Sequence, residues 1–529
     1  MTSYYSALFF TAFLPITVML YGMAPRRFRW AVLLLASYGF FFALSGALIA
    51  FVALSTAVVY ACARMMGANL AEKNRQLATA SSGKREIREA CKRKNRRIVF
   101  AAVVANIGIL AVLKYSGFFG LSLASTLAAF GISIDLSIPS FALPIGISFY
   151  TLMAVSYVVD VYRERTKADK NLGHVALFLA FFPGIMEGPL SRYNDVAPSL
   201  IAGEPLNRKN LYAGTLRIMW GMAKKIIVAD RLNAFVKPVF DNYGSYDGGV
   251  IALAAILYTI QLYCDFSGTM DVALGMGRAF NVTLPENFRQ PFFSRTASEF
   301  WQRWHITLGL WFKDYVYYPI SLSKPCKMLT TKARKRFGNR YGPLLASSVA
   351  LFCVWIGNGL WHGAGSQYLF FGLYYFVLIM AGGLIEPPCA RAAQHFGIDR
   401  NSWPYRTFQT VRTLAIIFVG ELFFRSNSLE AGLAMMGRIA GDFTIEAFTT
   451  GSALQIGFGV GDGLIVTLFM MLVLAVGVAK ERGCNLWEWA TAQSALLRWS
   501  LVILLFVGTV TFGAYGLGYT PVDPMYAQF

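Results

Sequence analysis

The stretch PLLASSVALFCVWIGNGLWHG, residues 343–363, decides the fold class of this chain. It is an apolar run of membrane-spanning length that ends in a histidine, His362, framed by Trp361 and Gly363. A transmembrane helix needs about 20 apolar residues, and an imidazole at membrane depth is costly unless it is paired. The run therefore predicts a membrane span, and His362 is either a functional residue or a structural histidine bonded to a carbonyl.

Apolar runs of similar length recur along the whole chain, which has 529 residues. Only 14% of them are charged, whereas a soluble domain carries about 25%, and the mean hydropathy is +0.49. We predict an all-α polytopic membrane protein with about 11–13 transmembrane helices. Shorter or more polar stretches at 115–130, 212–228 and 305–320 are interpreted as re-entrant or amphipathic. The candidate spans lie near 4–22, 30–45, 47–66, 98–113, 143–160, 174–190, 248–264, 343–360, 366–385, 408–424, 463–479 and 499–517.

The net charge of +20 comes largely from clusters between apolar runs. Residues 72–97 hold ten Lys or Arg against three Glu, and a second basic cluster runs from 324 to 340. No nucleic-acid-binding module accompanies them, so we expect cytoplasmic loops that obey the positive-inside rule and touch anionic lipid. Counting spans from the first loop places both termini outside. The seven cysteines show no metal-ligand spacing, so no metal site is expected.

A polar and aromatic region from Tyr263 to Tyr318 interrupts the apolar pattern. It contains Asp265, Asp271 and the frame FWQRWH, residues 300–305, which ends in a second histidine. Charge and irregular backbone survive at membrane depth only where protein buries them or water reaches them. We interpret the region as the lining of a central cavity, the alternative being an interfacial loop whose Trp and Tyr anchor it.

A series of short motifs follows in order between residues 140 and 430. Together these motifs resemble the membrane-bound O-acyltransferase family, in the bacterial branch that serves alginate O-acetylation and teichoic-acid D-alanylation. Each motif alone is weak, but their order is specific. They are LPIGISFYT (143–151), VDVYR (159–163), FFPG (181–184), EGP (187–189), RY (192–193), CDFSG (264–268), LPENF (284–288), FWQRWH (300–305), GLWHG (359–363) and FFR (423–425).

This resemblance implies a fold, a reaction and a pair of active residues. The fold is a ring of tilted helices around a central tunnel. The reaction takes an acyl group from a cytoplasmic thioester, acetyl-CoA or an acyl carrier protein, and leaves it as an ester on an outward-facing acceptor. By the motif match, His362 is the active histidine and His305 its companion.

Acyl transfer to a hydroxyl needs a base and a donor to the tetrahedral oxyanion. His362 is the predicted base, and His305, Trp304 or Asn358 is the predicted oxyanion donor or orienting group. Asp314 is a candidate for fixing a tautomer, and Trp361 for lining the tunnel. Asp265 and Glu187 are expected to be structural, paired with Arg192 or Arg303.

The chain ends PMYAQF, residues 524–529, which resembles the Phe-x-Tyr-x-x-Phe ending of this branch except that Pro524 replaces Phe. If the ending faces outward, Tyr526 is a candidate acyl relay. The alternative is a frayed apolar terminus.

We divide the chain into N-terminal helices with a basic cytoplasmic loop (1–130), an acyltransferase core (131–430) and C-terminal helices with an outward tail (431–529). The predicted function is O-acylation of a cell-surface polysaccharide, most simply with acetyl, from a multi-pass protein of the plasma or inner membrane. D-alanyl transfer to teichoic acid is one alternative, and a transporter or flippase is another. No bound cofactor is expected. A separate extracytoplasmic, esterase-like transferase is an expected partner, because the chain has no globular outer domain.

Overall fold

A computed structural model describes residues 4–132 and 141–515, and within these ranges the chain folds as helices without a strand. One isolated antiparallel bridge joins Phe288 to Trp304. Among the described residues, eight helical segments are long and apolar enough to cross a membrane. The predicted class, an all-α polytopic membrane protein, is confirmed. The eight segments are Arg26–Thr79, Lys84–Gly120, Gly248–Ala279, Lys324–His362, Ser366–His395, Trp403–Arg425, Val460–Glu481 and Ala495–Phe512.

The span count of about 11–13 stays a prediction. The segment Arg26–Thr79 contains two helices, α2 (Arg29–Ser45) and α3 (Ile49–Thr79), which are separated at Gly46. Gly46 has φ 53°, a left-handed value that suits glycine. The shorter apolar helices Phe9–Met23 and Ile147–Tyr162 fall below the length of a full span.

The described residues form two compact units, and each is considered by itself. One contains the residues up to Thr215 together with Ala273–Pro285, and the other contains Leu216–Val272 and the residues from Glu286 onward. The boundaries predicted at residues 131 and 431 stay a prediction. Besides α2 and α3, the helices of the first unit are α1 (Leu14–Met23), α4 (Lys84–Ala129), α5 (Ile147–Tyr162), α6 (Leu172–Ala180), α7 (Phe182–Ile185) and α8 (Tyr193–Ile201).

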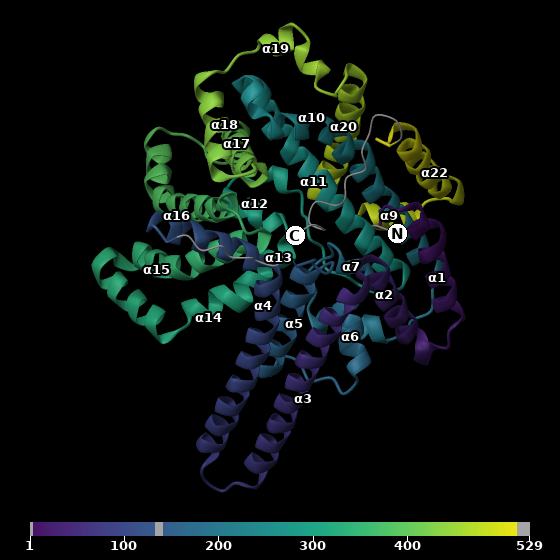
Figure 1. The fold of residues 1–529 in the computed structure, drawn as a ribbon, viewed down its shortest axis with the longest axis vertical. Coiled ribbons are helices and arrows are strands. Elements are labelled where there is room, and N and C mark those ends of the chain that lie inside the picture. The colour runs from purple at the N-terminus through teal and green to yellow at the C-terminus, as the bar shows by residue number, and fades with distance from the viewer. Residues whose placement is uncertain (1–3, 133–140, 516–529) are drawn as a thin grey trace. The chain divides into compact units, whose positions relative to one another are not determined.

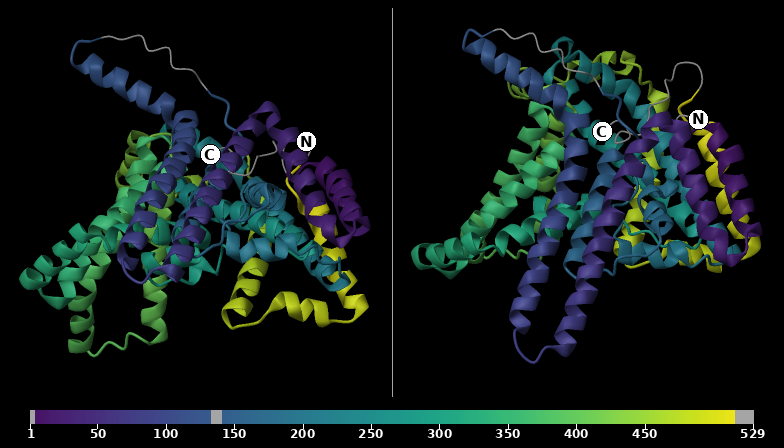
Figure 2. Two further views of the ribbon diagram at one scale, coloured as in Figure 1. Left: turned by 90° about the horizontal axis from the view of Figure 1, so that it is seen from below. Right: turned by 60° about the horizontal axis from the view of Figure 1, so that its bottom comes forward.

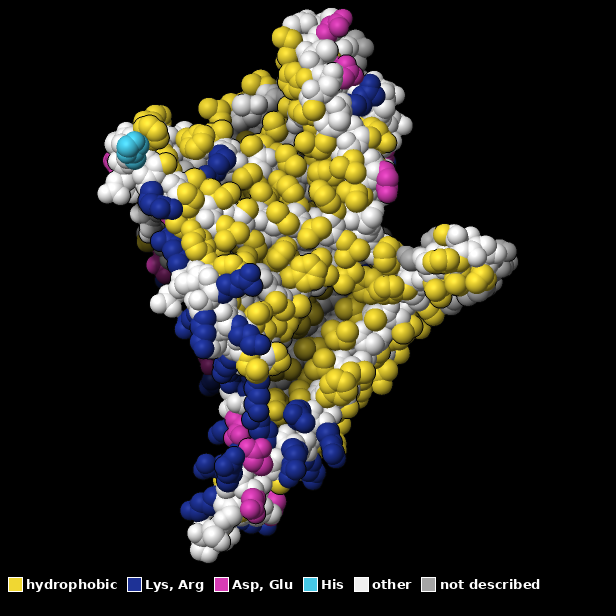
Figure 3. Space-filling model, turned by 90° about the vertical axis from the view of Figure 1, so that its left-hand side faces the viewer, with side chains coloured by type: hydrophobic (Ala, Val, Ile, Leu, Met, Phe, Trp, Pro, Cys, Tyr) yellow, Lys and Arg dark blue, Asp and Glu magenta, His cyan; other side chains and the backbone are white. Residues whose placement is uncertain are grey.

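The basic stretch 72–97 is a helical hairpin and not the loop that the sequence suggests. Helix α3 continues to Thr79 and α4 begins at Lys84, so only four residues connect them. Figure 1 shows the two helices side by side and projecting beyond α5 and α6, and the right view of Figure 2 shows the same hairpin. Lys and Arg side chains gather at the end of the hairpin, at the bottom of Figure 3.

Two stretches depart from the predicted pattern in the first unit. The expected span 174–190 is broken, because α6 ends at Ala180 and α7 stops at Ile185. Pro183, Gly184 and Pro189 interrupt helical hydrogen bonding there. The stretch 115–130, expected to be a separate amphipathic, re-entrant or buried segment, is the continuation of α4.

The second unit holds both candidate histidines. Helices α9 (Arg208–Ala223) and α11 (Gly248–Ala279) contribute residues to both units. Helix α15 is interrupted at Gly338, whose φ is 76°. The remaining helices of the unit are α10 (Asp230–Asp241), α12 (Ala297–Arg303), α13 (Ile306–Phe312), α14 (Tyr318–Ser321), α15 (Lys324–His362), α16 (Ser366–His395), α17 (Trp403–Arg425), α18 (Leu429–Gly441), α19 (Glu446–Thr449), α20 (Val460–Glu481), α21 (Leu486–Ala492) and α22 (Ala495–Phe512), with π-helical turns at Lys224–Ala229 and Lys313–Tyr317.

Candidate active site

His305 sits at a sharp turn between α12 and α13. Its backbone is left-handed, with φ 47° and ψ 51°, which is uncommon for a residue other than glycine. Extended residues of the LPENF motif hold the turn in place. The amide of Arg289 donates to the carbonyl of Arg303 at 2.9 Å, and the amide of Ile306 donates to the carbonyl of Asn287 at 3.0 Å. Strained backbone of this kind clusters at functional sites.

Asn287 faces Nδ1 of His305 with both polar atoms of its side chain, Nδ2 at 3.1 Å and Oδ1 at 3.3 Å. Its Oδ1 also accepts from the backbone amide of Thr307 at 3.0 Å and from the Thr307 hydroxyl at 2.9 Å, so we assign the shorter contact, from Nδ2 to Nδ1, as the hydrogen bond to the imidazole. With Nδ1 as the acceptor, the neutral ring carries its proton on Nε2.

His305 is also deeply buried, with 3% of its surface exposed. The Phe266 ring stands edge-on to the imidazole at 4.8 Å, and the Trp361 ring lies 5.6 Å away. Burial lowers the pKa of His305 to about 3, because a charged imidazolium is poorly solvated in this surrounding. His305 is therefore neutral at physiological pH and presents Nε2–H as a donor.

His362 is the last residue of α15 and is buried as well. Edge-on rings enclose it, with Phe424 of α17 at 4.9 Å and Phe371 of α16 at 6.0 Å between ring centroids. The backbone of Tyr368 lies directly against Gly359, where a side chain would collide with its carbonyl. The glycine lets α16 approach α15 closely, and this contact holds the cage around His362.

Trp361 joins the two histidines into one site. Its ring lies 5.6 Å from the His305 ring and 4.9 Å from the His362 ring. The 57 residues that separate them in sequence are thus bridged by one indole. We refer to His305, Asn287, Trp361, His362 and Phe424 as the histidine cluster.

The other predicted site residues lie at different distances from this cluster. Trp304 is buried one layer away, stacked on Phe300 at 5.4 Å and edge-on to Phe288 at 5.0 Å. Asn358 precedes His362 by one helical turn, and its Oδ1 is buried without a hydrogen-bond partner among the described residues. Asp314 lies in the π-helical turn that follows α13. Tyr526 lies outside the described residues.

Asp265 has a partner that the sequence analysis does not single out. Its carboxylate pairs with the ammonium of Lys225 at 2.8 Å, and Lys225 also pairs with Asp230 at 2.7 Å. Arg303, one of the partners predicted for Asp265, pairs instead with Glu299 at 2.8 Å and Glu481 at 3.0 Å, so that pairing is wrong. A structural role for Asp265 in a buried ion-pair network fits these contacts.

Sequence reasoning missed two residues of the site. Asn287 stands inside the LPENF motif and Phe424 inside FFR, so both were visible as letters but not as contacts of a histidine. It also missed Glu421, which is buried on α17 one turn before Phe424 and whose Oε2 has no hydrogen-bond partner within the described part of the chain. A single acid within an apolar helical run is the only signal that marked it.

Known proteins share this arrangement of motifs. A sequence model of the membrane-bound O-acyltransferase family matches residues 140–333. A probable alginate O-acetylase, AlgI, of Pseudomonas syringae pv. tomato is 30% identical over 432 residues, which cover 82% of this chain and 74% of that protein. The peptidoglycan O-acetyltransferase of Helicobacter pylori is 28% identical over 64% of each chain. The teichoic acid D-alanyltransferase of Bacillus subtilis is 28% identical over 46% of this chain and 59% of its own.

The AlgI match covers most of this chain and about three quarters of the relative. This chain belongs to the membrane-bound O-acyltransferase family and is a multi-pass membrane acyltransferase.

Proposed function

We propose that this acyltransferase takes an acetyl group from a cytoplasmic thioester donor and passes it across the membrane for O-acylation of a cell-surface polysaccharide. The observation that carries the proposal is the histidine cluster, in which one indole touches two buried imidazoles. The names of the relatives support acetyl and a glycan acceptor, since two of the three are O-acetylases or O-acetyltransferases.

The two histidines have different roles in the proposed reaction. His362 accepts the proton of the acceptor hydroxyl as its oxygen attacks the thioester carbonyl carbon. The carbonyl oxygen becomes an oxyanion, which accepts a hydrogen bond from Nε2–H of His305. When the tetrahedral intermediate collapses, the carbon–sulfur bond breaks, and the thiolate takes the proton from His362. In this proposal Nδ1 of His305 accepts from Nδ2 of Asn287, so the ring proton is on Nε2 and His305 acts as a donor rather than a base.

The supporting residues follow from their places around the cluster. Trp361 shapes the contact between the histidines, Asn358 orients His362 from the preceding turn, and Trp304 packs behind His305. We keep Asp314 as a candidate for orienting the site. Asp265 stabilises the structure around the site through its ion pair with Lys225.

The donor, partner and location complete the proposal. The donor is acetyl-CoA or an acetylated acyl carrier protein on the cytoplasmic side, and the membrane is the plasma or inner membrane. An extracytoplasmic esterase-like protein passes the acetyl group to the polymer. Tyr526, if it is outward-facing, is the residue that carries the group between the two as an aryl ester. D-alanyl transfer to teichoic acid is the second candidate, favoured by the Bacillus subtilis relative.

Everted membrane vesicles test the proposal. We expect acetyl-CoA labelled in its acetyl group to release free thiol and to deliver label into alkali-labile esters, and His362→Ala to abolish both. His395→Ala is the matched control, since that histidine lies at the end of α16 and away from the cluster. Label that enters the lumen without thiol release would identify a transporter, and label accepted only from a D-alanyl carrier protein would favour the second candidate.

A further inference from the structure

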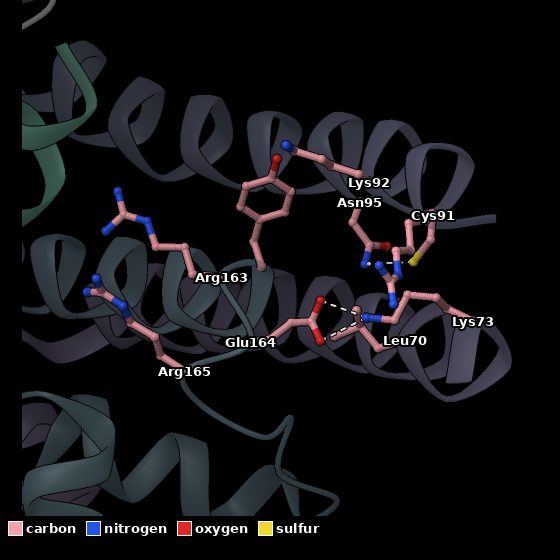
Figure 4. Close-up of a pocket in the computed structure, with 10 residues that line it drawn as sticks. Leu70, Lys73, Cys91, Lys92, Asn95, Arg163, Glu164 and Arg165 are labelled. Carbon is pink, nitrogen blue, oxygen red and sulfur yellow. Dashed lines mark hydrogen bonds and ion pairs between the residues drawn. The ribbon is translucent and has the colours of Figure 1, made fainter. Parts of the chain in front are cut away.

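A pocket of about 590 Å³ lies in the first unit, between α3, α4 and the end of α5. This size is typical of ligand pockets, which span about 300–1,000 Å³. Five cations line it, Lys73, Arg88, Lys92, Arg163 and Arg165, against the single carboxylate of Glu164. We refer to it as the hairpin pocket. Figure 4 shows Arg163 and Arg165 on one side of it and Lys73, Cys91 and Asn95 on the other.

Several contacts build the walls of the hairpin pocket. Glu164 has a left-handed backbone, with φ 60°, at the turn that ends α5. Its carboxylate accepts from the ammonium of Lys73 at 2.7 and 2.8 Å. On α4, Asn95 is buried and accepts from Asn69 of α3 at 2.8 Å. Arg165 is fixed through its carbonyl, which accepts from Asn194 at 2.9 Å.

The charge inside this frame is unbalanced. The ion pair with Lys73 already satisfies Glu164, the only acid in the lining. Arg88 and Lys92 stand one turn apart on the same face of α4, and neither they nor Arg165 forms an ion pair with any described residue. Lysine and arginine side chains that converge on one concave site favour a ligand that carries a phosphate.

The depth of the pocket indicates where that phosphate comes from. The buried apolar face of α3 ends at Met66, and the apolar run of α4 begins at Ile98. Leu70, Lys73, Lys92 and Asn95 lie three to seven residues beyond these points, or about 5–10 Å along a helix axis, and Arg88 lies ten residues before Ile98, or about 15 Å. The headgroup layer of a bilayer is roughly 5–8 Å thick on each side, so the pocket begins at headgroup depth and its Arg88 end lies at the aqueous edge of that layer.

We propose that the hairpin pocket binds the headgroup of an anionic phospholipid, with its phosphodiester between Arg88, Lys92 and Arg165. The lipid belongs to the leaflet next to the basic end of the hairpin. Basic pockets between transmembrane helices on the cytoplasmic side are known to hold such headgroups. The bound lipid ties α5 to the hairpin, because its phosphate joins cations of α4 to a cation beyond the end of α5.

Cys91 reports on occupancy, since it lines the pocket and is partly exposed. The purified protein is placed in phosphatidylcholine nanodiscs with or without phosphatidylglycerol, and iodoacetamide modification of each cysteine is followed by peptide mass spectrometry. We expect phosphatidylglycerol to slow modification of Cys91, by about tenfold when it is present at about ten times its Kd. Cys389, exposed on α16, is the internal control and keeps its rate.

Two variants with the same loss of charge separate a built site from general attraction. Arg88→Gln/Lys92→Gln/Arg165→Gln removes three pocket cations and is expected to restore the lipid-free rate at Cys91. Arg85→Gln/Arg93→Gln/Arg96→Gln removes three exposed cations of α4 outside the lining and is expected to retain protection. Equal loss of protection in both variants would overturn the proposal, as would a lack of protection in the unaltered protein.

A final arm distinguishes a lipid from a soluble ligand. Glycerol phosphate is added to phosphatidylcholine nanodiscs at the same phosphate concentration. We expect it to leave Cys91 unprotected, because it lacks the membrane anchor that concentrates a headgroup at this depth. Protection by glycerol phosphate equal to that by phosphatidylglycerol would contradict the lipid source.

Discussion

At the scale of residues, the contact with Asn287 distinguishes His305 from His362, two histidines that look equivalent in sequence. Its amide is oriented by two hydrogen bonds from Thr307, and its Nδ2 is the atom closer to Nδ1 of His305, at 3.1 Å against 3.3 Å for Oδ1. Residues behind a reacting imidazole commonly set its tautomer in this way. The sequence motifs alone do not distinguish the roles of His305 and His362. His362 is assigned as the base because His305, with its proton on Nε2, acts as the hydrogen-bond donor.

Asn287→Asp tests this assignment with almost no change in shape. A carboxylate accepts from Nδ1–H, so the variant moves the proton of His305 from Nε2 to Nδ1. We expect kcat to fall by about 10²–10³, the usual cost of losing an oxyanion donor, with little change in KM. Steady-state kinetics in vesicles measures both constants, and unchanged kcat would show that the tautomer of His305 is irrelevant.

Burial of His305 predicts a pH dependence of stability. Its pKa falls from about 6.5 in the unfolded chain to about 3 in the folded one, so protons bind more strongly to the unfolded state below pH 6.5. Between pH 7.5 and 5 this histidine alone should reduce the free energy of unfolding by about 2 kcal/mol.

His305→Gln removes that titration while keeping a polar side chain. Unfolding in detergent, followed at both pH values, should show the variant gaining about 2 kcal/mol relative to the parent as the pH falls. A difference between the two proteins that does not vary with pH would mean that His305 is not buried as described.

At the scale of elements, the contact between α15 and α16 positions His362. Gly359→Ala places a methyl group against the backbone carbonyl of Tyr368, which cannot move aside alone. We expect a loss of about 1–3 kcal/mol in stability, the cost of overpacking, together with reduced activity. Gly382→Ala on α16 is the control, because nothing lies within 4 Å of its added methyl, and alanine there should stabilise the helix by about 0.5–1 kcal/mol. Thermal unfolding of the two variants compares them, and equal behaviour would refute the close contact.

The ion pairs of Lys225 make a second prediction at this scale. Lys225→Met fills similar space but leaves Asp230 and Asp265 as buried carboxylates without their cation. Breaking such a network should cost about 3–5 kcal/mol. Lys237→Met removes an exposed pair with Asp241 and should cost less than about 1 kcal/mol. Similar losses in both variants would show that the Lys225 network is not a buried one.

Hydropathy predicted much of the helical architecture but not where helices bend or stop. The run 343–363 lies in α15, as expected, after the break at Gly338, and the helix ends at His362. The predicted span 174–190 was wrong because the prediction followed the apolar character of the stretch and gave too little weight to Pro183, Gly184 and Pro189. The basic stretch 72–97 was predicted to be a loop because hydropathy measures how readily residues enter lipid, not whether they form a helix. Lys and Arg are good helix formers, and the stretch is helical.

The motifs located the histidines but could not show how they meet. His305 and His362 touch through Trp361, which is a fact of packing between α15 and the turn before α13. Asn287 contacts His305, yet nothing in its spacing links it to a histidine. Lys225 as the partner of Asp265 likewise depends on how α11 meets the turn after α9. Contacts of this kind are set by tertiary structure and leave no periodic signal.

At the scale of the whole molecule, the proposed function requires one chain to take an acyl group from a cytoplasmic thioester and make it available outside. Members of the family transfer acyl groups, and the long apolar helices place this chain in the membrane. The histidine cluster provides the groups for the chemical step. The hairpin pocket adds an anchor for anionic lipid in the other unit, and its loss should affect stability rather than the chemical step.

The most direct test is surface acetylation in cells that depend on this protein. Alkali-released acetate from the extracellular polysaccharide is measured in cells carrying the parent chain, His362→Gln or the control His395→Gln, each at equal membrane abundance. We predict that His362→Gln lowers ester-linked acetate by at least about 10², the cost of losing a general base, while His395→Gln leaves it unchanged. Normal acetylation by His362→Gln would contradict the assignment of His362 as the base and, with it, the central claim.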